Sequence, residues 1–88
     1  MTIILNGRVM TSRDAAHEHM AVQLSFPTYY GRNLDALYDL LTERDEKTEL
    51  VFENSEAMLA TLGSYGDALL DTLRDAAENN PALVLTIQ

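Results

Sequence analysis

The chain has 88 residues, 47% of them apolar, which suits one small domain spanning 1–88 and excludes a second domain. It contains no cysteine, which excludes disulfides, thiolate metal sites and thiol nucleophiles. Fourteen acidic and six basic residues give a net charge of −8, which argues against nucleic acid or anionic lipid as a ligand.

The acidic residues are concentrated in one region of the chain. Residues 35–78 hold twelve acidic and three basic residues, whereas residues 1–34 carry a net charge of +1. No apolar run approaches the about 18 residues of a membrane span, and the first seven residues lack the charged start of a signal peptide. We therefore expect a cytoplasmic protein that does not contact a membrane.

Strands and helices are predicted to alternate along the chain, from short runs rich in β-branched residues and from apolar residues repeated every three or four positions. The expected elements are a strand over 2–5, an extension or loop over 8–10, a helix over 13–24, a loop over 25–32, a helix beginning after Asn33, a solvated charged loop over 43–47, a strand over 49–53, a helix from Asn54 or Ser55 to near Gly63, a helix over 66–79 and a strand over 83–87. Strands separated by helices indicate right-handed crossovers and a parallel sheet. The predicted fold is therefore α/β, a three-stranded parallel sheet packed with four helices.

The helix after Asn33 has the clearest pattern. Asn33 is a favourable N-cap. Apolar side chains then recur at the spacing of one helix face: Leu34, Leu37, Tyr38 and Leu41. Asp35 and Asp39 lie one turn apart on the exposed side, where like charges destabilise a helix by roughly 0.2–0.5 kcal/mol.

The last helix carries a second acidic stripe, opposite its leucines: Asp67, Asp71, Asp75 and Glu78. If the two helices are neighbours, their stripes flank one surface whose negative potential would steer a basic partner. Solubility accounts for the stripes equally well, because an acidic protein places carboxylates on its solvated faces.

Two tyrosines, Tyr29 and Tyr30, stand next to Gly31 just before the acidic helix. Tyrosines at an exposed rim are typical anchors of protein interfaces. One of the two is expected to pack into the core, with Tyr30 as the candidate.

Motifs for catalysis or metal binding are absent from the sequence. His17 and His19 are two positions apart on a helix and do not face each other, so we expect capping or partly buried histidines instead of a metal pair. No phosphate-binding glycine loop, zinc protease motif or calcium loop occurs. We therefore expect no enzyme, no cofactor and no metal site. An acyl carrier protein would need Asp-Ser-Leu where this chain has Asn33-Leu34-Asp35.

Residues 26–39, Phe-Pro-Thr-Tyr-Tyr-Gly-Arg-Asn-Leu-Asp-Ala-Leu-Tyr-Asp, closely resemble the central motif of the barstar family, intracellular inhibitors of barnase-like ribonucleases. The resemblance extends to the opening strand ending in Asn6-Gly7, to His17, to Glu53, to Arg74 followed by an acid, and to the closing strand. It implies the same α/β fold and an inhibitor that blocks the active site of a basic ribonuclease.

The resemblance also implies roles for individual residues. Asp39 would take the place of a substrate phosphate and meet the arginines and catalytic histidine of the partner. Asp35 would accept hydrogen bonds from backbone or a second basic group, and Tyr29 would lie against the catalytic histidine region. The other implied partner-binding residues are Gly31, Asn33, Tyr38 and Asp75.

Several positions depart from the type member of the family. Tyr38 replaces a tryptophan, a second tryptophan is replaced near Arg44, and Asp75 is one methylene shorter than the family's glutamate. Arg32 places a positive charge in the recognition loop, which would suit a partner with an acid opposite it. These departures bear on which ribonuclease is bound.

The leading hypothesis is an inhibitor that is monomeric when free and forms a 1:1 complex with a basic, extracellular-type ribonuclease. The alternative is a barstar-like adaptor for a basic protein that is not a nuclease, suggested by Arg32, Tyr38 and the missing tryptophan near Arg44.

Overall fold

The computed structural model describes all 88 residues. Its elements are β1 (Thr2–Asn6), the 3-10 helix η1 (Gly7–Val9), α1 (Arg13–Leu24), α2 (Leu34–Thr42), β2 (Thr48–Glu53), α3 (Ser55–Leu62), α4 (Ser64–Asn79) and β3 (Leu83–Ile87). Two details differ from the sequence prediction. The extension or loop over 8–10 is replaced largely by η1, and α4 begins at Ser64, two residues before the predicted start.

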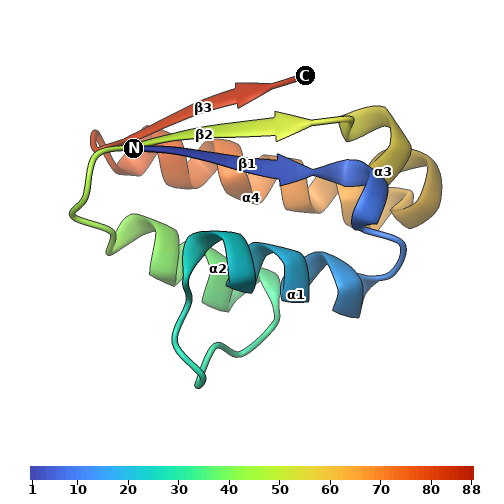
Figure 1. Ribbon diagram of the computed structural model, residues 1–88, viewed down its shortest axis with the longest axis horizontal. Coiled ribbons are helices and arrows are strands. Elements are labelled where there is room, and N and C mark those ends of the chain that lie inside the picture. The colour runs from blue at the N-terminus through green and yellow to red at the C-terminus, as the bar shows by residue number, and fades with distance from the viewer.

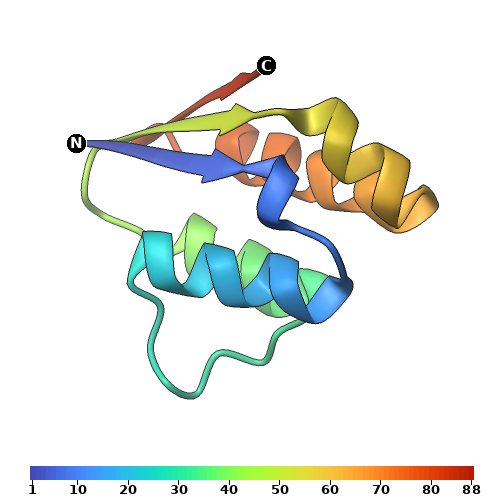
Figure 2. The same ribbon diagram turned by 45° about the vertical axis from the view of Figure 1, so that its right-hand side comes forward.

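The three strands form a parallel sheet in the order β1-β2-β3 (Figure 1). The register aligns Ile3 with Leu50 and Leu50 with Leu85, so these three apolar side chains point to the same face of the sheet. In both Figure 1 and Figure 2, α1, α2 and α4 lie on one side of the sheet, and α3 follows β2 at the sheet's end. The predicted α/β fold is confirmed.

The other face of the sheet is open. Parallel sheets are usually covered on both faces, and the run Ile3-Ile4-Leu5 predicts a buried strand. The structure buries Ile3 and Leu5 but leaves Ile4 47% exposed. That prediction is therefore wrong for Ile4, because side chains alternate across a strand and the helices cover only one side.

The charged loop over 43–47 is exposed as predicted, except at Arg44. Its side chain is only 16% exposed, and its guanidinium donates to the Leu24 carbonyl at 3.2 Å and to the Thr48 hydroxyl at 2.8 Å. The buried Asn80 side chain donates to the carbonyls of Leu41 and Arg44. These bonds join the ends of α1 and α2 to the start of β2.

Helix α2 packs against α4, and the apolar faces of both contribute to the core. The buried residues of the two helices are Leu37, Leu41, Gly66, Leu69, Leu70, Leu73 and Ala76. Each acidic stripe lies opposite the buried side of its helix, so both stripes are on the surface of the packed pair.

A buried histidine joins three segments. His17 of α1 is 1% exposed, its Nδ1 lies 2.6 Å from the Tyr30 hydroxyl, and its Nε2 lies 2.7 Å from the Tyr65 hydroxyl. Tyr30 belongs to the loop between α1 and α2, and Tyr65 to the first turn of α4. His17 thus holds that loop in place. His17 is more deeply buried than the sequence predicts, since partly buried histidines are expected. His19 agrees with that prediction: its ring is half-buried and accepts a hydrogen bond from the Asn6 backbone N–H at 2.9 Å.

The hydrogen bonds of His17 require a neutral ring. A neutral imidazole has one donor and one acceptor, which the two hydroxyls can satisfy. Burial lowers the pKa of His17 below its ordinary 6.5, and the charge of Arg32 adds to this effect against the opposing charge of Asp14. Burial raises the pKa of Tyr30 and Tyr65, so both phenols stay protonated. A protonated His17 would have two donors and would leave one phenol proton without its acceptor.

Acidification is therefore expected to destabilise the fold through His17. Because its pKa is lowered in the folded state, the unfolded chain binds more protons below pH 6.5. The free energy of unfolding then falls as the pH drops below that value, by up to about 1.4 kcal/mol per pH unit for one group. Urea unfolding between about pH 7.5 and pH 5 measures this dependence.

Two variants show which histidine causes the pH dependence of the free energy of unfolding. His17→Gln removes the titrating ring and keeps a donor and an acceptor, whereas His19→Gln removes the second histidine whose pKa burial lowers. We expect the first variant to flatten the pH dependence more than the second. An unchanged slope in His17→Gln would contradict the role assigned to this ring.

Candidate functional site

The loop from residue 25 to residue 33 is fixed at both ends and in its middle. Ser25 ends α1 in the left-handed conformation, with φ of 55°. The Tyr30 N–H donates to the Pro27 carbonyl at 3.0 Å, and the Tyr30 ring lies 4.7 Å from the Phe26 ring, centroid to centroid. As predicted, one of the two tyrosines is buried; it is Tyr30, whereas Tyr29 is 80% exposed. A rigid loop therefore presents one large ring to solvent.

Asn33 joins this loop to α2. Its Oδ1 accepts from the Ala36 N–H at 2.7 Å, which confirms the predicted N-cap, and its Nδ2 donates to the Gly31 carbonyl at 3.2 Å. Both polar ends of the side chain are used within the chain, so Asn33 sets the geometry between the loop and the helix.

Asp39 lies in the second half of α2. It lines a hollow of about 220 Å³ together with Tyr29, Gly31 and Glu43. Asp35, one turn earlier, lines a separate hollow with Asn33. Both aspartates are exposed, and neither forms an ion pair with a basic residue of the chain. The loop and helix therefore present two unneutralised carboxylates beside an exposed tyrosine.

Tyr38 and Asp75 lie at a different part of the surface, between α2 and α4, where Asn79 links them. The Asn79 side chain donates to the Tyr38 hydroxyl and to the Asp75 carbonyl, both at 3.0 Å. Tyr38 is half-buried and Asp75 is exposed and forms no ion pair. Asn79 thus connects these two predicted residues, although neither lines a hollow with Asp39 or Asp35.

Sequence reasoning missed several residues beside those it named. Glu43 adds a carboxylate to the Asp39 hollow, and the spacing of Asp35, Asp39 and Glu43 at steps of four could have revealed it. Arg13 and Tyr65 line the Asp35 hollow but come from the starts of two other helices. No local pattern connects them with α2.

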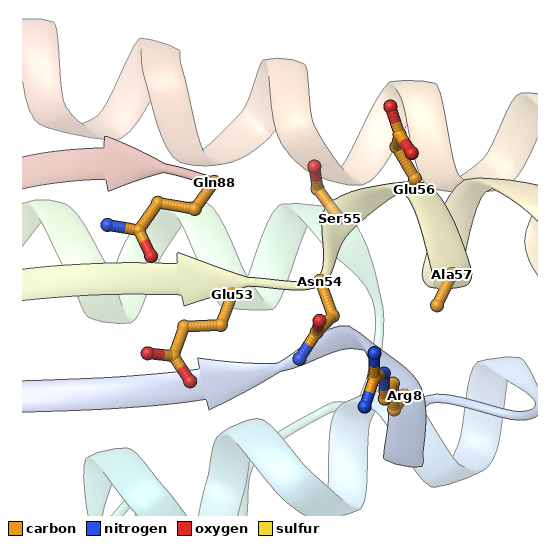
Figure 3. A pocket seen from close by; sticks show the side chains of 7 residues that line it. All are labelled: Arg8, Glu53, Asn54, Ser55, Glu56, Ala57 and Gln88. Atoms are coloured by element: carbon orange, nitrogen blue, oxygen red, sulfur yellow. The ribbon is translucent and has the colours of Figure 1, made fainter.

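The largest of the three hollows described here, about 640 Å³, lies elsewhere. None of the predicted partner-binding residues lines it. Figure 3 shows that its lining comes from η1, the end of β2, the start of α3 and the residue after β3. Arg8, Glu53 and Glu56 give it mixed charge. No group of three or more histidine or acidic side chains is placed to hold a metal ion. None of the helices combines the length and the apolar character needed to cross a bilayer.

Comparison with known proteins shows which proteins this chain resembles over its length. Residues 1–87 match the family described as "Barstar (barnase inhibitor)". The chain is also similar to a Bacillus subtilis (strain 168) protein named "Putative ribonuclease inhibitor YrdF", with 43% identity over 77 residues that cover 86% of this chain and 85% of that protein. Members of the family are inhibitors and not enzymes. With the match spanning nearly every residue, from β1 through the loop and α2 to β3, the chain belongs to the barstar family of barnase inhibitors.

Proposed function

We propose that this chain is an intracellular inhibitor that blocks the active site of a basic, barnase-like ribonuclease in a 1:1 complex. The observation that carries the proposal is the pair of exposed, unpaired carboxylates on α2, Asp35 and Asp39, beside the exposed ring of Tyr29. Membership of the barstar family supports the same assignment.

In the proposed complex, Asp39 occupies the position of a substrate phosphate. A carboxylate accepts short, charge-assisted hydrogen bonds from arginine and protonated histidine, the groups that bind phosphate in a ribonuclease. Asp35 meets a second basic group or backbone N–H, while Asp75 and Tyr38 extend the contact onto α4. Glu43, on the Asp39 hollow, adds negative potential there.

The rigidity of the loop favours tight binding. Because Tyr30 is anchored by His17 and Asn33 bridges Gly31 to α2, Tyr29 and Asp39 are held in place before the partner arrives. Ordering a mobile loop would otherwise reduce the affinity, since each immobilised side chain costs about 0.5–1.5 kcal/mol. The free chain is proposed to be a monomer with this face open.

Asp39→Ala is expected to weaken inhibition of a barnase-like ribonuclease. Loss of the carboxylate leaves basic groups of the partner buried without a counter-charge, which costs about 2–5 kcal/mol or more in protein interfaces. Titrating RNA cleavage with each variant measures the change. Glu56→Ala on α3 removes the same charge outside the proposed face and should inhibit like the unchanged chain. Equal inhibition by both variants would contradict the proposal.

Salt is expected to slow complex formation. Long-range attraction between the acidic face and a basic cleft is screened beyond about 10 Å at 0.1 M ionic strength. The association rate should therefore fall steeply between about 0.05 M and 0.5 M NaCl, with a smaller effect on dissociation. Stopped-flow mixing gives both rates, and an association rate independent of salt would count against steering by this face.

The two loop tyrosines are expected to separate binding from stability. Tyr29→Ala should weaken inhibition while changing the free energy of unfolding by less than about 0.5 kcal/mol, since the ring is 80% exposed. Tyr30→Phe removes the hydroxyl that pairs with His17 and should destabilise the fold by about 1–3 kcal/mol. Urea unfolding and inhibition titrations distinguish the two variants. Loss of stability in Tyr29→Ala with loss of inhibition alone in Tyr30→Phe would contradict the roles assigned to the two tyrosines.

A further inference from the structure

Two arginines stand at one corner of the proposed binding face. The helices α1, α2 and α4 begin at the same end of the molecule, which Figure 2 shows on its right-hand side. Arg13 from α1, Arg32 from the loop and Tyr65 from α4 consequently line one hollow of about 420 Å³ with the carboxylates Asp14 and Asp35. Of the other two hollows described above, one contains a single basic residue and the other contains none.

Both guanidinium groups are held in place. The Arg13 guanidinium lies 4.3 Å from the centroid of the Tyr65 ring, a cation–π contact. Arg32 donates to the Glu18 carboxylate at 2.6 Å, and its side chain is still 50% exposed. The two cations are therefore ordered and accessible in the free chain.

Local backbone and helix-dipole preferences do not favour arginine at these positions. Arg32 has a φ of 53°, in the left-handed region that glycine and asparagine adopt more readily. Its pair with Glu18 is exposed, and such pairs contribute little. Arg13 is the first residue of α1, where the helix dipole disfavours a cation. A chain with a net charge of −8 thus places two of its six basic residues together at positions where they are not favoured locally.

We propose that the hollow lined by Arg13 and Arg32 receives a carboxylate side chain of the ribonuclease. The inference rests on the proposed function and concerns the choice of partner. Arginine presents a planar fork of donors that matches a carboxylate in two parallel hydrogen bonds. Because Asp35 lines the same hollow, the matching partner surface carries an acid beside its basic residues. A ribonuclease with a basic residue in place of this acid is rejected by like charge.

A double-mutant cycle tests the assignment, using a barnase-like ribonuclease that the unchanged chain inhibits. Arg32→Gln and Arg13→Gln are each combined with Asn or Gln replacements of the acidic residues that border the active-site cleft of the nuclease. We expect Arg32→Gln to weaken binding about tenfold, and one nuclease carboxylate to account for most of that loss. Arg8→Gln, on η1 and outside the proposed face, is the matched control and should bind unchanged.

A second variant separates binding from folding. Arg32→Gly relieves the positive φ, so it should keep or raise the free energy of unfolding while weakening inhibition as much as Arg32→Gln. Unchanged inhibition by both Arg32 variants and by Arg13→Gln, alongside its loss in Asp39→Ala, would overturn this inference and leave the proposed function intact. Weakening that couples to no nuclease carboxylate would also overturn it. Full inhibition by Asp39→Ala would instead refute the proposed function.

Discussion

The hydrogen bonds of His17 are the constraint on which the recognition surface depends. The nine-residue loop between α1 and α2 contains no helix or strand, and the buried imidazole holds it from inside through Tyr30. The second ring nitrogen holds Tyr65 at the start of α4. One neutral side chain thereby connects α1, the loop and α4. Replacing either phenol would leave a buried polar nitrogen unpaired, which costs about 1–3 kcal/mol.

The acidic face is maintained against local electrostatics by the apolar packing beneath it. Carboxylates one turn apart on α2 repel each other, and no basic side chain of the chain pairs with Asp35 or Asp39. Burial of Leu37 and Leu41 against α4 outweighs that repulsion, because fully burying one leucine contributes about 1.5–3 kcal/mol. The protein can therefore hold unneutralised charge at its surface in the free state.

The same surface combines two signs of charge. Acidic groups predominate along α2 and α4, and the arginine pair lies where the three helices begin. Complementary charge speeds encounter with any basic partner, whereas a pattern of alternating sign selects among partners.

The helix and strand order, the N-cap at Asn33 and the exposure of Asp35 and Asp39 could be predicted from the sequence, because each follows from local periodicity and capping. The family resemblance followed from the long motif in residues 26–39. Only the tertiary structure decided that Tyr30 turns inward, that Arg44 is largely buried, and that Arg13 and Arg32 line one hollow. Those outcomes depend on contacts between residues distant in the chain, about which local patterns carry no information.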